Sequence, residues 1–344
     1  MNDKMKSAPL VTVQCLVYNH EPFLRKCLDG FVMQETTFPF EVLVHDDAST
    51  DGSVAIIREY AEKYPDIIRP IFETENQYGK HDGSLRRIVH GALNPAAKYV
   101  ALCEADDYWT DKQKLQKQVS FLEAHPEYNM CCNRTLLYSE RDKKMVGETF
   151  CYEKSCDIKI KDVVNRTGLF ISTCSIVYRK TMRDNYPAYC LQAAAGDYSL
   201  QILCAMKGKI RYFNEPMSVY RVNNSASWMS QQEWGSSSEQ NLRRIRSMVN
   251  MFQGIANDYP EHAALLRNKI AQYVNTGSPR AHVSPEQNKE YFAAFEDVAK
   301  DYSIGWKIDL FFRKHKDCFS QLYVRFIAPR LLGGYRQKRK FVKS

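Results

Sequence analysis

The first hundred residues alternate between short apolar runs and amphipathic runs, and this alternation limits the fold more than any other feature. The run Leu10 to Val17 is apolar and β-branched, as in a buried strand, and Glu21 to Val32 has apolar residues three and four positions apart, as in a helix. The pattern recurs at 40–45 with 54–64 and at 67–72 with 84–93, and a strand-like run at 99–103 follows. Such alternation predicts a parallel sheet with right-handed helical crossovers.

The rest of the chain has a mixed pattern of strands and helices up to about residue 230 and a helical pattern after it. We expect strands near 130–138 and 174–178, a helix at 197–206, a strand pair at 209–222, and helices at 241–255 and 285–299. The predicted fold class is α/β, with a mixed, mainly parallel sheet flanked by helices and a helical C-terminal appendage. The predicted division is an α/β domain at 1–230 with halves at 8–108 and 109–230, an appendage at 231–305 and a tail at 306–344.

The composition is that of an ordinary globular protein. Of the 344 residues, 44% are apolar and 26% are charged, which excludes the low hydrophobicity and high charge of disordered chains. The eleven cysteines include no C-x-x-C pair, which argues against a zinc or dithiol redox site and favours reduced thiols. No signal-peptide core precedes the first strand, and no later run reaches about 18 apolar residues. We therefore expect a cytoplasmic protein.

The positive charge of the chain is concentrated in its tail. Residues 306–344 contain eleven Lys and Arg against two Asp, a local charge of +9, whereas the whole chain carries +8. Apolar residues recur there at helical spacing with basic residues between them. Two interpretations stay open: a peripheral contact to an anionic membrane surface, and a helix that packs on the protein. Nucleic-acid binding has only this tail in its favour, and we do not expect it.

Acidic residues directly follow two of the predicted strands. Ligands of open α/β sheets bind beyond the carboxyl ends of the strands, so the residues after Val17, Val44 and Cys103 should converge on one crevice. Asp46 and Asp47 lie at the second of these ends. The small polar residues that follow them are ordinary helix-start residues. Two adjacent carboxylates repel one another unless they receive donors such as a base imide or ribose hydroxyls, so the pair predicts a nucleoside site.

A second acidic cluster follows the strand at 99–103. Glu104, Asp106 and Asp107 place three carboxylates within four positions. Hard oxygen ligands at a strand end suit Mg²⁺ or Mn²⁺ bridging a diphosphate, and such an ion stabilises the charge on a leaving nucleoside diphosphate. The alternative is a solvated acidic turn, but the adjoining Tyr108 and Trp109 favour a shaped cleft.

Two further polar residues have no clear functional role when each is considered alone. Asp197 opens an amphipathic helix, where an aspartate is most simply a helix cap. Arg221 lies at the end of a strand-like run and could clamp a phosphate, but an ordinary surface ion pair explains it equally well.

Together these segments resemble the inverting family 2 of glycosyltransferases, which have the GT-A fold, over roughly residues 8–228. The run Val11 to Asn19 (VTVQCLVYN) is similar to the family's V-S-V-x-x-x-x-Y-N, and Asp46 to Ser53 is similar to D-D-x-S-x-D-G-S. Glu104 to Asp107 looks like the metal motif D-S-D-D. The longer run from Glu104 to Val119 also resembles bacterial members that build capsular or other surface polysaccharides.

The resemblance implies a role for each candidate residue. Gly196 and Asp197 match the family's E-D pair, so Asp197 is the expected general base, which takes the proton of an acceptor hydroxyl. Asp106 is the expected ligand of Mn²⁺ or Mg²⁺. The halves at 8–108 and 109–230 become the nucleotide-binding and acceptor halves. The implied nucleotide-sugar contacts are Tyr18, Asn19, Asp46, Asp47, Glu104, Asp107 and Arg221.

The expected reaction is the inverting transfer of a sugar from a nucleotide-diphosphate donor, most commonly UDP-linked, to a hydroxyl of a glycan or lipid-linked acceptor. Asn223 stands where many relatives have a histidine that contacts metal or diphosphate, so a degenerate protein that only binds nucleotide or glycan is a rival interpretation. A nucleotidyltransferase or a dehydrogenase would need a glycine-rich loop after the first strand, and none is present. The segments 76–83 and 167–173 are expected to shape specificity.

Overall fold

The computed structural model describes residues 8–80, 82–149, 152–166, 170–223, 238–277 and 285–299, together with residues 307 and 311. The chain divides into two compact units, residues 1–235 and 236–344. All the candidate site residues belong to the first unit. The basic tail at 306–344, for which membrane contact and packing on the protein both stay open, lies outside the described residues except at two positions.

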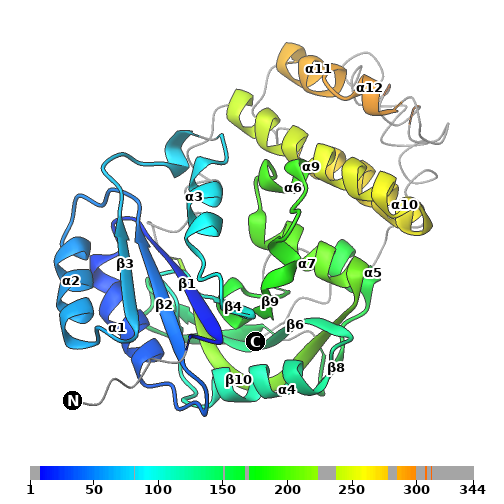
Figure 1. Ribbon diagram of the computed structural model, residues 1–344. Helices are drawn as coiled ribbons and strands as arrows, with labels where there is room; N and C mark the ends of the chain where they lie inside the picture. Colours follow the sequence, from blue (N-terminus) through cyan, green and yellow to red (C-terminus); the bar gives the residue numbers. More distant parts are fainter. Residues whose placement is uncertain are drawn as a thin grey trace. The chain divides into compact units, whose positions relative to one another are not determined.

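Within the described residues of the first unit, ten strands form one sheet in the order β3-β2-β1-β4-β9-β6-β10-β5, with β7 beside β6 and β8 beside β10 (Figure 1). The first four strands are parallel, with Val17 opposite Asp46 and Gln14 opposite Leu102. The predicted parallel arrangement of these strands is therefore confirmed. The elements of this half are β1 Val11–Val17, α1 Glu21–Val32, β2 Phe40–Asp46, α2 Ser53–Lys63, β3 Ile68–Phe72, the 3-10 turn η1 Tyr78–Lys80, α3 Ser84–Ala92 and β4 Tyr99–Leu102.

Beyond β4 the sheet becomes mixed. β9 is antiparallel to β4 and to β6, whereas β10 is parallel to β6 and antiparallel to β5. The elements are β5 Tyr108–Trp109, α4 Lys114–Ala124, β6 Tyr128–Ser139, β7 Lys144–Thr149, β8 Cys156–Asp157, α5 Ile160–Asn165, η2 Thr173–Ser175, β9 Val177–Arg179, η3 Lys180–Arg183, α6 Ala188–Leu191, α7 Gly196–Lys207 and β10 Lys209–Val222.

The core holds the acidic turn after β4 in place. Every residue of β2 is buried, as expected for a central parallel strand covered on both faces. Phe31 of α1 packs edge-to-face on Trp109 of β5, with ring centroids 4.8 Å apart. The indole Nε1 donates a hydrogen bond of 2.8 Å to the carbonyl of Cys174. A Cβ at Gly30 would lie 3.0 Å from the backbone N and O of Trp109, so α1 approaches β5 closely because this residue is glycine.

Two local features differ from the sequence-based expectation. Residues 209–222 form a single strand instead of a strand pair, and β10 follows β6 with register shifts around Phe213, Pro216 and Ser218. A proline cannot donate to the sheet ladder, so a shift at this position lets the strand continue. The sequence does not predict α4, because its buried face contains the polar residues Lys114 and Gln118.

The second unit is helical in its described residues, as predicted for the appendage. α9 (Ser238–Asp258) packs against α10 (Ala263–Gly277), with the rings of Phe252 and Tyr273 5.9 Å apart. The hydroxyl of Tyr291 in α11 (Pro285–Ala293) donates a 2.8 Å hydrogen bond to the Val274 carbonyl. α12 (Glu296–Ala299) follows, and η4 (Pro260–His262) precedes α10. No helix among the described residues has the length and apolarity needed to cross a membrane.

Candidate active site at the carboxyl end of the sheet

The two acidic segments meet at the carboxyl end of β1. The backbone N–H of Asp47 donates to the carbonyl of Val17 at 2.9 Å, and the N–H of Ala105 donates to the carbonyl of Leu16 at 3.1 Å. The turn after β2 and the turn after β4 therefore flank the same strand end. This is the convergence that the parallel topology predicts.

Asp46 has one carboxylate oxygen without a protein partner. Its side chain is 1% exposed, and Oδ2 accepts the N–H of Ser49 at 3.1 Å. Ala48 between them has a φ of +63°, so the chain turns sharply there to bring that N–H back. Oδ1 is buried and has no hydrogen-bond partner in the described part of the chain. A buried acceptor of this kind is costly unless a ligand or water donates to it.

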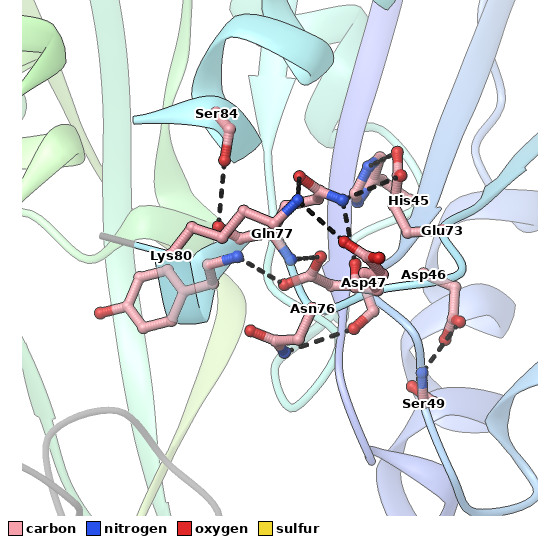
Figure 2. A network of polar contacts seen from close by, with 11 residues as sticks. His45, Asp46, Asp47, Ser49, Glu73, Asn76, Gln77, Lys80 and Ser84 are labelled. Atoms are coloured by element: carbon pink, nitrogen blue, oxygen red, sulfur yellow. Dashed lines mark hydrogen bonds and ion pairs between the residues drawn. The ribbon is translucent and has the colours of Figure 1, made fainter. Parts of the chain in front are cut away.

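Asp47 anchors the segment that contains η1. Its Oδ1 accepts the N–H of Gln77 at 2.7 Å and its Oδ2 accepts the N–H of Tyr78 at 3.0 Å. Figure 2 shows the carboxylate of Asp47 beside Gln77 and Asn76. The amide of Asn76 donates to the Asp47 carbonyl at 3.3 Å. The charge of Asp47 is thus stabilised by two backbone donors, and the 76–83 segment is tied to the strand end.

Tyr18 and Asn19 form the turn after β1. Asn19 has a φ of +55°, a left-handed conformation that asparagine tolerates better than most residues. Its N–H donates to Ser49 Oγ at 2.9 Å, and its Oδ1 accepts the N–H of Thr50 at 2.8 Å. These bonds join the turns after β1 and β2. The ring of Tyr18 beside them is 44% exposed and available for stacking.

Asp197 belongs to the same cluster as the acidic turn after β4. Burial, together with the nearby charges of Asp106 and Asp197, raises the pKa of Glu104 to about 8. The carboxylate of Asp197 accepts a hydrogen bond from Thr173 Oγ1 at 2.9 Å and another from the N–H of Tyr198 at 2.8 Å. Asp197 therefore lies near Glu104 and Asp106, although more than ninety positions separate it from both in the chain.

Asp107 and Arg221 have protein partners. Asp107 is 1% exposed, its Oδ1 accepts the Arg221 N–H at 2.9 Å, and burial with Asp106 beside it raises its pKa well above the ordinary value. The Arg221 guanidinium donates to Glu140 at 2.6 Å and to the Asp106 carbonyl. It also lies over the Tyr108 ring at 4.7 Å. These contacts fix the acidic turn against β10, and the donor contacts of both residues stay predictions.

Three neighbours of the site were not identified from the sequence. Thr173 orients Asp197, and it lies in a segment that the sequence marks only as a specificity loop. Burial lowers the pKa of His20 more than the nearby charges of Asp106 and Asp51 raise it. Glu140 pairs with Arg221. Asn223, at the position of the expected histidine, donates to Ser139 Oγ at 3.1 Å. None of these long-range pairings leaves a local sequence pattern.

The carboxylates of the acidic turn after β4 are the candidate ligands of a divalent cation. Among the described residues, no three His, Cys, Asp or Glu side chains are grouped so that the protein alone would enclose a metal ion. Mg²⁺ and Mn²⁺ in nucleotide sites use one or two carboxylates and complete their shell with phosphate oxygens and water. Burial and the nearby charges of Asp106 and Asp197 raise the pKa of Glu104, and a cation bound at this turn would lower it. The residues present fit this second kind of site.

A family model described as "Glycosyl transferase family 2" matches residues 13–186, just over half of the chain. The chain belongs to glycosyl transferase family 2. The match includes β1 from Val13 onward, both acidic turns and η2, but ends ten positions before α7.

Relatives of this family-2 chain come from several bacteria. An uncharacterized protein of Mycobacterium tuberculosis is 36% identical over 222 residues, which is 64% of this chain and 61% of that protein. The chain thus spans less than two thirds of the length of this relative. A Bacillus subtilis protein whose name assigns it to teichuronic acid biosynthesis as a glycosyltransferase, TuaG, is 32% identical over 115 residues, 33% of this chain and 42% of its own.

A solved structure shares the fold. Staphylococcus aureus TarS residues 1–349, crystallised with UDP-GlcNAc, superposes with a TM-score of 0.63 at 16% identity, covering 89% of this chain and 88% of that one. A likeness at this identity shows the fold alone, and the predicted GT-A-like α/β fold is confirmed.

Proposed function

We propose that this protein transfers a sugar from a nucleotide-diphosphate donor, with UDP as the nucleotide, to a hydroxyl of a glycan or lipid-linked acceptor, inverting the anomeric carbon. The observation that carries the proposal is the grouping of Asp197 with Glu104 and Asp106, beside the strand end that bears Asp46 and Asp47. A transferase of this kind needs a base, a charge-neutralising site for the leaving group and a nucleoside site within one crevice.

Asp197 acts as the general base in this proposal. Its carboxylate is oriented by the hydroxyl of Thr173 at 2.9 Å and by the N–H of Tyr198 at 2.8 Å. It accepts the proton of the acceptor hydroxyl while the acceptor oxygen forms its bond to the anomeric carbon. The bond from that carbon to the diphosphate oxygen breaks in the same step, so one displacement inverts the configuration.

The nucleoside is held at the carboxyl ends of β1 and β2. The exposed ring of Tyr18 offers a stacking face for the base. The unpartnered Oδ1 of Asp46 accepts from a base imide or a ribose hydroxyl. Asp47 and Asn19 contribute by fixing the segments around the base, since their side chains bond the backbone of Gln77 and Thr50.

The diphosphate lies against the acidic turn after β4. A bound Mn²⁺ or Mg²⁺ would offset the negative charge that builds on the departing nucleoside diphosphate. Asp106 would hold it, with Glu104 beside it. Asp107 and Arg221 hold this turn in place, because their hydrogen bonds join it to β10 and to Glu140.

The acceptor is a growing bacterial surface polysaccharide in this proposal. The named role of TuaG in teichuronic acid biosynthesis supports this class. The basic tail at 306–344 would keep the enzyme at the inner membrane surface, where a lipid-linked acceptor is found. Truncation before Trp306 should then abolish sedimentation with anionic phosphatidylglycerol liposomes. Unchanged sedimentation would dismiss the tail as an anchor and leave the chemistry untouched.

The function is tested by release of nucleoside diphosphate. The intact protein is incubated with Mn²⁺ and, in turn, UDP-glucose, UDP-galactose, UDP-N-acetylglucosamine and GDP-mannose. We expect metal-dependent release from one donor, with a kcat about 100-fold lower or less in Asp197→Asn, which keeps the size but loses the base. Equal rates for the two proteins would contradict the base assignment. No release of nucleoside diphosphate from any of the four donors would favour a degenerate binding protein.

A further inference from the structure

Arg86 links the nucleotide-binding half to the segment that carries Asp197. Arg86 lies on α3, and its guanidinium donates to the carbonyl of Leu191 at 2.5 Å and to those of Cys190 and Ala194 at 3.5 Å. These carbonyls belong to α6 and to the four residues that precede α7. One side chain therefore holds the whole connection that leads to Asp197.

Gly196, the residue before Asp197, provides the space for this guanidinium. A Cβ at Gly196 would lie 2.8 Å from Arg86 Nε, 3.0 Å from Cζ and 3.1 Å from Nη2. All three distances are shorter than normal van der Waals contact. An arginine can usually move away from such a contact, but three backbone carbonyls retain this one. The glycine at this position is thus matched to the arginine on α3.

The contact also places a positive charge beside the base. Burial lowers the pKa of Arg86, and the charge of Asp197 is among the smaller effects that raise it. Gly196 and Asp197 are the two residues that match the family's E-D pair, and Gly196 stands at the first position. A side chain there would point into the space that Arg86 occupies.

We propose that Arg86 is a positioning residue for Asp197 and that Gly196 is required because any larger residue displaces the Arg86 guanidinium. This inference rests on the proposed function of Asp197 as the base. Arg86 does not touch the reacting atoms. It fixes the start of α7 so that the carboxylate of Asp197 stays with Thr173, Glu104 and Asp106.

A double-mutant cycle tests the contact without any substrate. Gly196→Ala should lower the Tm of the intact protein by about 4 °C or more, because the new Cβ overpacks against Arg86. In the Arg86→Ala background the same Gly196→Ala change should lower the Tm no further, since the space is then empty. Gly91→Ala on α3 is the matched control, because nothing lies within 4 Å of its Cβ. Equal, additive losses in both backgrounds would overturn the inference.

Activity separates positioning from a general loss of structure. Arg86→Ala and Gly196→Ala should each reduce kcat for UDP release up to about 100-fold, because a displacement of the base by about 1 Å can lower the rate by that factor. Calorimetric binding of UDP with Mn²⁺ should stay within about twofold, since the nucleoside site lies on β1 and β2. Equal loss of UDP binding and kcat would contradict positioning of the base.

The failure of the inference and that of the proposed function are distinguishable. If Asp197→Asn loses activity while Arg86→Ala and Gly196→Ala keep it, only the inference is overturned. If Asp197→Asn keeps wild-type UDP release, the base assignment within the proposed function is overturned, and the role of Arg86 in positioning the base with it. Arg87→Ala, which removes a neighbouring arginine with a surface ion pair to Asp82, is the control and should keep full activity.

Discussion

Replacing Arg221 with methionine tests whether this residue clamps the acidic turn or binds a donor phosphate. The change keeps an unbranched apolar side chain and removes the guanidinium. Arg221 is 5% exposed and its ion-pair partner Glu140 is 12% exposed, so water cannot replace the 2.6 Å contact freely. The same guanidinium supports the carbonyl of Asp106 and lies over the rings of Tyr108 and Phe23.

The expected loss follows from the partners left behind. Removing one member of a buried ion pair costs about 3–5 kcal/mol. Glu140 keeps a second, more exposed partner in Lys143 at 2.6 Å, so we take the lower end, about 3 kcal/mol. For a unit of this size each kcal/mol lowers the Tm by about 2–4 °C, and the total is about 6–12 °C.

The assay is thermal unfolding followed by circular dichroism, with calorimetric titration of UDP and Mn²⁺ into each variant. Arg87→Met is the matched control, because Arg87 and its partner Asp82 are 56% and 55% exposed and 3.8 Å apart, and such pairs contribute less than about 1 kcal/mol. Glu140→Gln should reproduce part of the loss, because it weakens the same ion pair from the other side. An unchanged Tm with weakened UDP binding would refute the clamp and favour a phosphate contact.

Three further results are expected. The pKa of Glu104 is about 8 in the folded chain against 4.5 ordinarily, so the folded state retains a proton that the unfolded state has lost. The free energy of unfolding should fall as pH rises through that window and fall less in Glu104→Gln, as urea titrations at pH 5 and pH 8.5 would measure. Gly30→Ala should cost about 1–3 kcal/mol because its Cβ would lie 3.0 Å from the Trp109 backbone, and a loss no larger than that of Gly91→Ala would contradict the packing. Tyr18→Ala should weaken UDP binding about tenfold or more through lost stacking while the Tm stays constant, because the ring is 44% exposed; a Tm shift without a binding change would oppose this role.

The parallel half of the sheet was predictable because its signal is local. β1 to β4 are short and mostly apolar runs, and α1 to α3 carry apolar residues at helical spacing, so the spacing within each segment indicates a strand or a helix. The acidic turns were predictable for the same reason, since Asp46 and Asp106 follow strands that share one sheet edge. Helix α4 was missed because it buries Lys114 and Gln118.

The supporting contacts of the site were not predictable from local pattern. Arg86 meets residues more than a hundred positions away, and Arg221 meets Asp106 at a similar separation. Arg221 alone reads as a phosphate ligand or a surface pair, and only the fold reveals its buried partner Glu140. The residues proposed to contact a ligand can thus be predicted from their place at strand ends. The residues that hold them in place can be identified only from the tertiary packing.

The central claim is that carboxylates from the turns after β2 and β4 and from the start of α7 surround one nucleotide-sugar site. A crystal structure of the intact protein with UDP and Mn²⁺ tests it most directly. The account predicts the uridine against Tyr18 and Asp46, the cation on Asp106, and the carboxylate of Asp197 facing the open side of the diphosphate. A nucleotide bound elsewhere, or Asp197 directed away from the diphosphate, would contradict it.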